Sequence, residues 1–152
     1  MRILLCQDLE LIDGAEPDDI MDLAVRAAGH AERERTGSSD GVFAQALRRT
    51  HAELRHCTEL QFAEVATKFF PDDPLTIVPL AVTLATVMNS ARTAILFAAN
   101  VGGDSDSVAS IAGAILGARY PGTIDDQWYA AVDAVNSHDL VSLADDLSKL
   151  RH

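Results

Sequence analysis

Apolar side chains recur at three- and four-residue intervals along most of the chain, the spacing of one face of a helix. A helix is predicted to begin at Pro17, because proline suits a first helical turn and Asp18 and Asp19 complement the helix dipole there. The predicted apolar face of this helix consists of Ile20, Leu23, Ala24, Ala27, Ala28 and Ala31. No stretch keeps the strict alternation of a β-strand. The pattern therefore predicts an all-α protein.

Turn-forming residues divide the rest of the chain into further helices. The glycine- and serine-rich stretch 36–41 is a predicted loop, and the strongest helix breaker is Pro71-Asp72-Asp73-Pro74. Between the two breakers we expect a helix with Val42, Phe43, Ala46, Leu47 and Leu54 on one face, and a helical continuation through 60–66. After the second breaker we expect one helix or two abutting helices over 75–99, and helices over 108–119, 128–136 and 140–150.

Residues 75–118 are nearly free of charge and rich in Ala, Val, Leu and Ile. Helices that are apolar on all sides belong in a core, so this segment is predicted to lie at the centre of the fold. Trp128 is expected to pack on that core. Polar residues and Arg92 interrupt the apolar stretch 75–99, so it is not expected to span a membrane.

Composition narrows the class of protein further. The chain has 152 residues, of which 48% are hydrophobic, a length and content typical of one folded domain. Its net charge of −11 argues against a nucleic-acid surface and suits a cation or a cationic partner. Cys6 and Cys57 lack histidines at zinc-ligand spacing. The opening apolar stretch is too short for the core of a signal peptide, so we expect none. We interpret the two cysteines as buried thiols of a cytoplasmic protein.

The stretch from Gly102 to Ser107, Gly-Gly-Asp-Ser-Asp-Ser, combines flexible backbone with oxygen ligands. Glycines before a helix let a ligand approach the backbone, and the free amides of a helix start can bind a phosphate. Asp104, Asp106 and Ser107 offer hard oxygen ligands that suit Mg²⁺, Ca²⁺ or Mn²⁺. The simpler interpretation is a turn in which Asp106 or Ser107 caps the next helix.

Two better-known carboxylate motifs do not fit this chain. An EF-hand loop that began at Asp104 would need glycine at position 109 and glutamate at 115, where Ala109 and Ile115 stand. Asp18-Asp19-Ile20-Met21-Asp22 has the spacing found in terpene synthases, but the chain is short and poor in aromatic residues, which make up 5%. Acids in the first turn of a helix explain that segment.

The stretch from Gly102 to Ala118 resembles the C-terminal signature of the ADP-ribosylglycohydrolase family, which reads Gly-Gly-Asp-Thr-Asp-Thr before a helix of small residues. The flanking segments that also resemble the family are 77–81, 94–100, Trp128 and 135–140. The resemblance covers roughly residues 60–150. It suggests a helical N-terminal segment, 1–60, followed by the C-terminal part of a family domain, 61–152.

This resemblance implies an all-α fold with a binuclear Mg²⁺ or Mn²⁺ centre that cleaves the glycosidic bond of ADP-ribosyl or related ribosyl groups. Carried over by position, it makes Asp104, Asp106 and Ser107 metal ligands, with the two aspartates catalytic. Gly102, Gly103 and Ser105 are expected to bind the ADP-ribose-like ligand. Serine stands where the family has threonine at 105 and 107, and the hydroxyl at 107 is retained.

The chain departs from the family in length, because the resemblance covers only a C-terminal half. The glycine-rich opening and the Thr-Asp-Asp-Thr-like motif that complete the family's metal sites are missing. We therefore expect a hydrolase that is inactive alone and forms a cytoplasmic heterodimer with a separately encoded N-terminal half, or otherwise a homo-oligomer. The alternative is a non-catalytic structural or regulatory module in which 102–107 serves as a helix cap.

Overall fold

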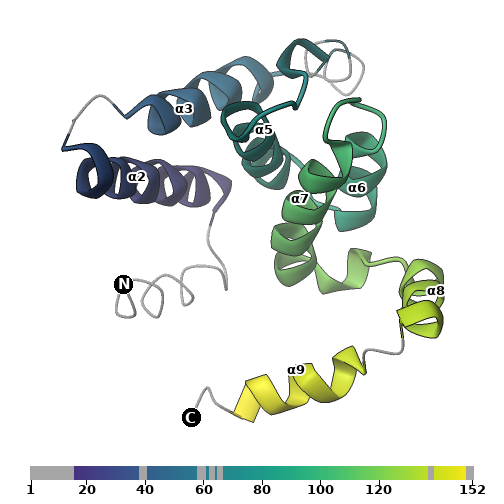
Figure 1. The fold of residues 1–152 in the computed structure, drawn as a ribbon. Coiled ribbons are helices and arrows are strands. Elements are labelled where there is room, and N and C mark those ends of the chain that lie inside the picture. Colours follow the sequence, from purple (N-terminus) through teal and green to yellow (C-terminus); the bar gives the residue numbers. More distant parts are fainter. Residues whose placement is uncertain are drawn as a thin grey trace.

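The computed structural model describes residues 16–37, 41–57, 61, 64, 67–136 and 139–149, and this part of the chain is helical (Figure 1). The elements are α2 (Pro17–Thr36), α3 (Val42–Leu54), η1 (Thr67–Phe69), α5 (Pro74–Val87), α6 (Ala91–Ala98), α7 (Ser105–Arg119), η2 (Pro121–Thr123), α8 (Asp126–Asn136) and α9 (Leu140–Ser148). No strand occurs within these ranges, which confirms the all-α prediction. Cys6 and most of the expected continuation over 60–66 lie outside the described residues.

The helices pack in two groups that share α5 (Figure 1). On one side α2 and α3 lie side by side and antiparallel, and both contact α5. On the other side α6 and α7 pack against each other, and α7 also packs against α5. Each group has its own cluster of buried side chains, and α5 contributes to both. We call α2, α3, α5, α6 and α7 together the body.

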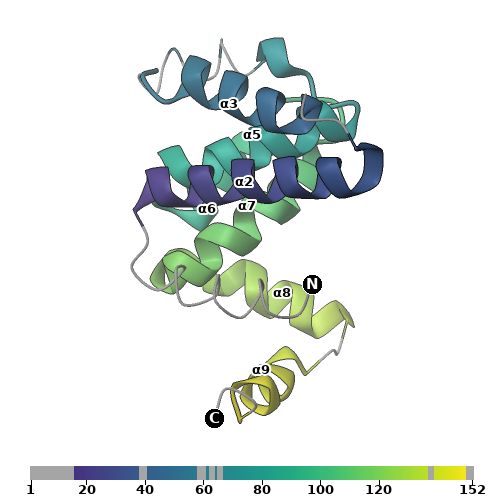
Figure 2. The same cartoon turned by 90° about the vertical axis from the view of Figure 1, so that its left-hand side faces the viewer.

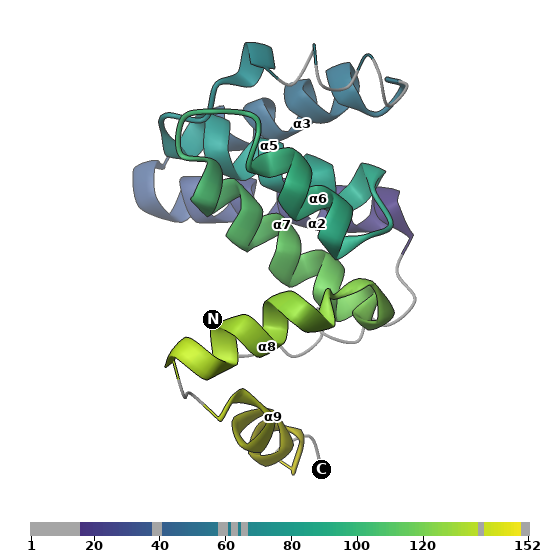
Figure 3. The same ribbon diagram turned by 90° about the vertical axis from the view of Figure 1, so that its right-hand side faces the viewer.

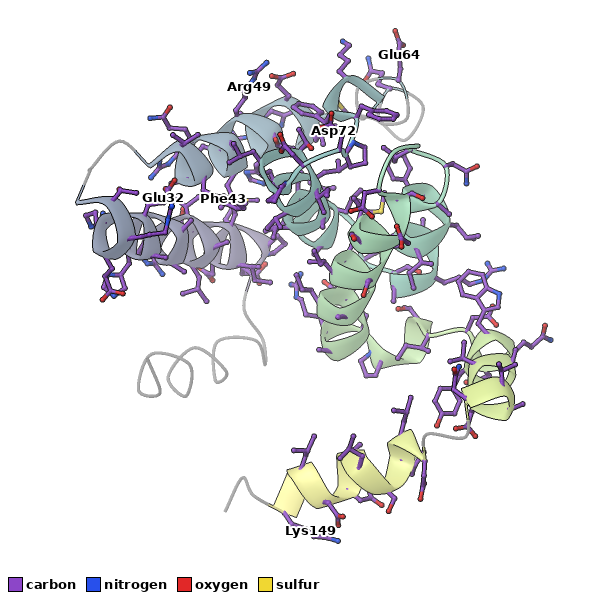
Figure 4. The ribbon with its side chains drawn as sticks, viewed as in Figure 1. Glu32, Phe43, Arg49, Glu64, Asp72 and Lys149 are labelled. Carbon is purple, nitrogen blue, oxygen red and sulfur yellow. The ribbon has the colours of Figure 1, made fainter. Side chains whose placement is uncertain are left out.

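The turn between α2 and α3 is fixed at both ends by local chemistry. Gly37 ends α2 in the left-handed region, with φ of 70°, and its amide donates to Arg33 O. Gly41, at the start of α3, has no side chain to cap that helix. Glu32 of α2 takes this role, since its Oε1 accepts a hydrogen bond of 2.8 Å from the Phe43 amide (Figure 4). The two helices are therefore joined by a cap as well as by packing.

The apolar segment 75–118 forms the centre of the fold, as predicted. Leu80 and Leu84 of α5 and Val108 and Leu116 of α7 are fully buried. Residues 88–90 separate α5 from α6, so the sequence over 75–99 forms two helices. Asp73 caps α5, because its Oδ1 accepts from the amides of the next helical turn at 2.7 and 3.1 Å. The composition of this segment thus predicted its position correctly.

Three burial predictions are wrong in detail. On α2 the buried residues are Met21 and Val25, whereas Ala27 and Ala31 are exposed. The larger side chains bury more apolar area, so they set the face that α2 turns toward α3 and α5. Trp128 is 36% exposed and lies beside Arg92, not in the core. Cys57 is half-buried, and its thiol donates to a backbone carbonyl one turn earlier.

The last two described helices, α8 and α9, stand apart from the body, and we call residues 124–149 the C-terminal arm (Figures 2 and 3). Neither helix contains a buried residue. The arm is attached near its start, where Arg92 Nε of α6 lies 2.9 Å from Asp125 Oδ2 and the guanidinium sits over the Trp128 ring. Just before the arm, Thr123 Oγ1 accepts a hydrogen bond from the Ala91 amide.

Candidate functional site

The glycine-rich stretch lies in the loop between α6 and α7. Val101 is buried and anchors the loop, and Gly102 and Gly103 then turn the chain with φ of 88° and 58°. Asp104 is the residue that precedes α7, which begins at Ser105. The helix therefore starts three residues before the predicted Val108. As a result, the predicted ligands Asp106 and Ser107 lie in its first turn.

The two glycines are required by the chain's own packing. Positive φ favours glycine at both positions. A Cβ at Gly102 would approach the Phe70 ring to 3.1 Å, and one at Gly103 would collide with the Pro71 carbonyl. These contacts explain both glycines without a ligand, so the predicted ligand-binding role of Gly102, Gly103 and Ser105 stays a prediction.

A second loop, 70–73, holds the site from the other side. The Asp104 amide donates a hydrogen bond of 2.6 Å to Pro71 O, which ties the start of α7 to the segment before α5. This bond places Asp72, labelled in Figure 4, at the same end of the body. Sequence reasoning missed the contribution of Phe70 and Pro71, because no spacing rule links them to a loop some thirty residues later.

The side chain of Asp104 has close neighbours in the first turn of α7. Although Asp104 occupies the capping position, its side chain makes no capping hydrogen bond of ordinary geometry, and neither Asp106 nor Ser107 is the cap. The pKa of Asp104 is lowered from its ordinary value, first by a hydrogen bond with the Asp106 side chain and then by the Ser107 hydroxyl and amide. The three predicted ligands therefore lie close together at the start of α7.

These residues fit a hard cation as part of a ligand set. Carboxylate and hydroxyl oxygens are the ligands that Mg²⁺ and Mn²⁺ prefer. Within the described residues, however, no group of three or more His, Cys, Asp or Glu side chains is arranged to hold a metal ion. The described part of the chain thus offers a pair of carboxylates and no larger cluster.

A pocket of about 540 Å³ opens at the opposite end of α7. Its lining includes Met88, Phe97 and Tyr120, and none of residues 102–107. Tyr120 directly follows α7, so the length of that helix separates the pocket from the candidate site. None of the helices in the described ranges is long and apolar enough to cross a membrane.

Comparison with known proteins gives one positive finding. The model of the ADP-ribosylglycohydrolase family matches residues 6–152. The chain belongs to the ADP-ribosylglycohydrolase family. This membership assigns it to a class of hydrolases and agrees with its all-α fold. The match also reaches much further toward the N-terminus of the chain than the resemblance over residues 60–150. Comparison with curated proteins and with solved structures found no match.

Proposed function

We propose that this chain contributes Asp104, Asp106 and Ser107 to a binuclear Mg²⁺ or Mn²⁺ centre that hydrolyses the glycosidic bond of ADP-ribosyl or related ribosyl groups. The observation that carries the proposal is the arrangement at the start of α7. Asp104 stands at the capping position directly before α7, and Asp106 and Ser107 lie in the first turn of that helix, so two carboxylates and a hydroxyl stand together at one helix start. A loop that served only as a helix cap would need one side-chain oxygen there and not both Asp104 and Asp106.

Each residue has a distinct role in this proposal. Asp104 and Asp106 supply the negative charge that holds the cations. Ser107 adds a neutral oxygen one turn into the helix. Gly102 and Gly103 place no side chains beside the carboxylates, which leaves room for a ribose. When bound, the metal orients ribose hydroxyls and a water molecule.

A partner chain is part of the proposal, because a magnesium ion requires octahedral oxygen coordination. Three oxygens from one loop leave most positions to other ligands, and the described residues provide no third carboxylate in place. We propose that a separate chain with the N-terminal half of the family domain supplies the missing ligands. A second copy of this chain would bring only the same loop again.

The test is a calorimetric titration of Mn²⁺ and Mg²⁺ into the full chain and three variants. Asp104→Asn and Asp106→Asn should each weaken saturable binding by about tenfold or more, because each removes a charged ligand. Asp126→Asn is the matched control, since Asp126 is also an exposed acid in the first turn of a helix, α8. Equal binding by Asp106→Asn and the control would contradict the metal assignment and favour the non-catalytic module.

The partner is tested separately by hydrolysis of an ADP-ribosylated substrate in the presence of Mg²⁺. The chain alone should be inactive, and activity should appear when an N-terminal half from a longer family member is added. Efficient hydrolysis by the unaccompanied chain would contradict the need for a partner, while leaving the metal assignment to the titration.

A further inference from the structure

The ring of Phe70 lies directly on the backbone of the two glycines that precede α7. A Cβ on Gly102 would lie 3.1 Å from Cε2 of this ring, and a Cβ on Gly103 would lie 3.2 Å from Cε1. The ring therefore spans both glycines. Yet Phe70 is 54% exposed, so the ring covers the loop while it stays at the surface. Its contact with the glycines, rather than burial in the core, explains its position.

The next residue, Pro71, fastens the same loop by a hydrogen bond. Its side chain is fully buried, which fixes the position of its carbonyl, and this carbonyl accepts the hydrogen bond of 2.6 Å from the Asp104 amide. A Cβ on Gly103 would collide with the same carbonyl. Phe70 and Pro71, which we call the clasp, thus contact residues 102–104.

The start of α5 holds the clasp in place. The amides of Asp72 and Asp73 donate hydrogen bonds of 3.1 and 3.2 Å to Thr76 Oγ1. The Asp73 side chain in turn accepts from the amides of the first turn of α5. Because α5 is the central helix and packs against α7, the body fixes where the clasp lies. The clasp then passes this position on to the loop before α7.

The loop needs such support because its two glycines do not fix their own conformation. Gly102 and Gly103 have φ of 88° and 58°, but a glycine adopts negative φ about as readily. Buried Val101 fixes only the beginning of the loop. The contacts of the clasp are therefore what favours the observed conformation at the glycines and at Asp104.

We propose that Phe70 is a positioning residue of the candidate metal site, whose ring keeps Asp104 together with Asp106 and Ser107 at the start of α7. This inference rests on the proposed function and adds a residue outside the loop that sets the affinity for Mg²⁺ or Mn²⁺. The phenyl ring has no ligand atom, so it acts through Asp104. A loop already held in one conformation loses less conformational entropy when the cation binds.

The test compares the Mn²⁺ affinity of the full chain and its variants by calorimetric titration. Phe70→Ala should weaken saturable binding by about tenfold, a usual loss when a residue that orients metal ligands is removed. Phe70→Leu keeps apolar volume over the glycines and should restore part of the affinity. Leu75→Ala is the matched control, because Leu75 is also exposed, at 38%, and is not among the nearest neighbours of either glycine.

A second control, Phe69→Ala, separates positioning from a general loss of stability. Phe69 is half-buried and packs on the core, so its removal should lower the thermal midpoint more than Phe70→Ala does. The Mn²⁺ affinity of Phe69→Ala should nevertheless stay that of the unaltered chain. Far-UV circular dichroism identifies a temperature at which all variants are folded, and the titrations are made there.

Hydrogen exchange of the Asp104 amide tests the clasp without any metal. Phe70→Ala should speed this exchange by about tenfold in the metal-free chain, because the bond to Pro71 O would open more often. Leu75→Ala should leave the exchange unchanged. Saturating Mg²⁺ should slow it in the unaltered chain, since coupling between the clasp and the metal acts in both directions.

The outcomes distinguish this inference from the proposed function. Full Mn²⁺ affinity in Phe70→Ala, or an equal loss in Leu75→Ala or Phe69→Ala, would overturn the positioning role and leave the metal ligands as assigned. Unchanged exchange of the Asp104 amide in Phe70→Ala would show that the ring does not hold the loop. If the unaltered chain showed no saturable binding, the proposed function itself would be contradicted, and the positioning role with it.

Discussion

The body and the C-terminal arm differ in what their apolar residues contact. In the body, α5 and α7 contribute side chains that are fully buried, such as Leu84 and Leu116. In the arm, Val132 and Leu143 lie at similar helical spacing but remain about half exposed, at 51% and 54%. Each body helix contacts at least two others, and α5 contacts all four, whereas α8 and α9 pack extensively against no other described helix.

This difference shows that apolar spacing does not by itself produce burial. A helix buries its apolar face only when another element lies opposite that face. In the body α5 is apolar on nearly all sides and sits between two helix pairs, which together cover it. The arm instead leaves the body after η2 and is attached mainly through Arg92 and Thr123. The same residue types are thus buried in the body and exposed on the arm.

The largest expected effect compares a buried leucine of the body with an exposed leucine of the arm. Leu84→Ala should lower the free energy of unfolding by about 2–5 kcal/mol, because it removes apolar contacts and leaves a cavity. Leu143→Ala in the arm should change it by no more than about 0.5 kcal/mol. Urea unfolding followed by circular dichroism measures both. Similar losses in the two variants would show that the arm is already covered in solution.

A second, smaller effect compares glycines in three loops. Gly103→Ala should cost about 1–3 kcal/mol, because alanine there is strained at positive φ and its Cβ meets the Pro71 carbonyl. Gly37→Ala, with φ of 70° and open space around it, should cost about 1 kcal/mol from φ alone. Gly122, next to the arm, has neither constraint and serves as the control. Thermal melts rank the three variants by their loss of stability. Equal losses for Gly103→Ala and Gly37→Ala would mean that residues 70–71 move away from the added Cβ at little cost.

The smallest effect concerns the attachment of the arm at low pH. The pKa of Asp125 is lowered, chiefly by the hydrogen bond from the Trp128 amide and further by Arg92 and the Gln127 amide. A folded-state pKa below the unfolded value means that the charged carboxylate favours the folded form. This contribution is present above about pH 4 and is lost as the pH falls through the folded-state pKa.

Fluorescence of Trp128, the only tryptophan, should therefore change as the pH is lowered from about 6 to about 2, before the body unfolds. Asp125→Asn keeps an oxygen that can accept the capping hydrogen bonds and should remove most of this pH dependence. Arg92→Gln should move the change toward higher pH, because it removes an interaction that lowers the pKa of Asp125. An unaltered profile in Asp125→Asn would assign the change to another group.

The sequence predicted the elements of the body well, because their signals are local. Pro74 and Asp73 start α5 through a fixed φ and a side-chain cap, and the absence of charge over 75–118 indicated a central position. It failed on the buried face of α2, because alanine spacing alone does not reveal which side the neighbouring helices cover. It also failed for Trp128, whose place depends on where the arm leaves the body.

For the candidate site, the sequence identified the residues but not their surroundings. Gly102 to Ser107 could be found from composition and spacing, since glycines and closely spaced oxygen ligands are a local pattern. The supporting contacts of Phe70 and Pro71 could not be found, because only the packing of α5 against α7 brings that loop to Gly103. The same packing decided that Asp104, rather than Asp106 or Ser107, precedes the helix.

The sequence by itself determined that this chain is helical, that residues 75–118 form its centre, and that one short loop carries its candidate metal ligands. These properties follow from backbone preference, side-chain spacing and local composition, which act over a few residues. The tertiary structure alone decided which apolar stripes are covered and which loop supports Asp104. Both depend on contacts between residues far apart in the chain, and such contacts are set by the packing of whole helices rather than by any local pattern.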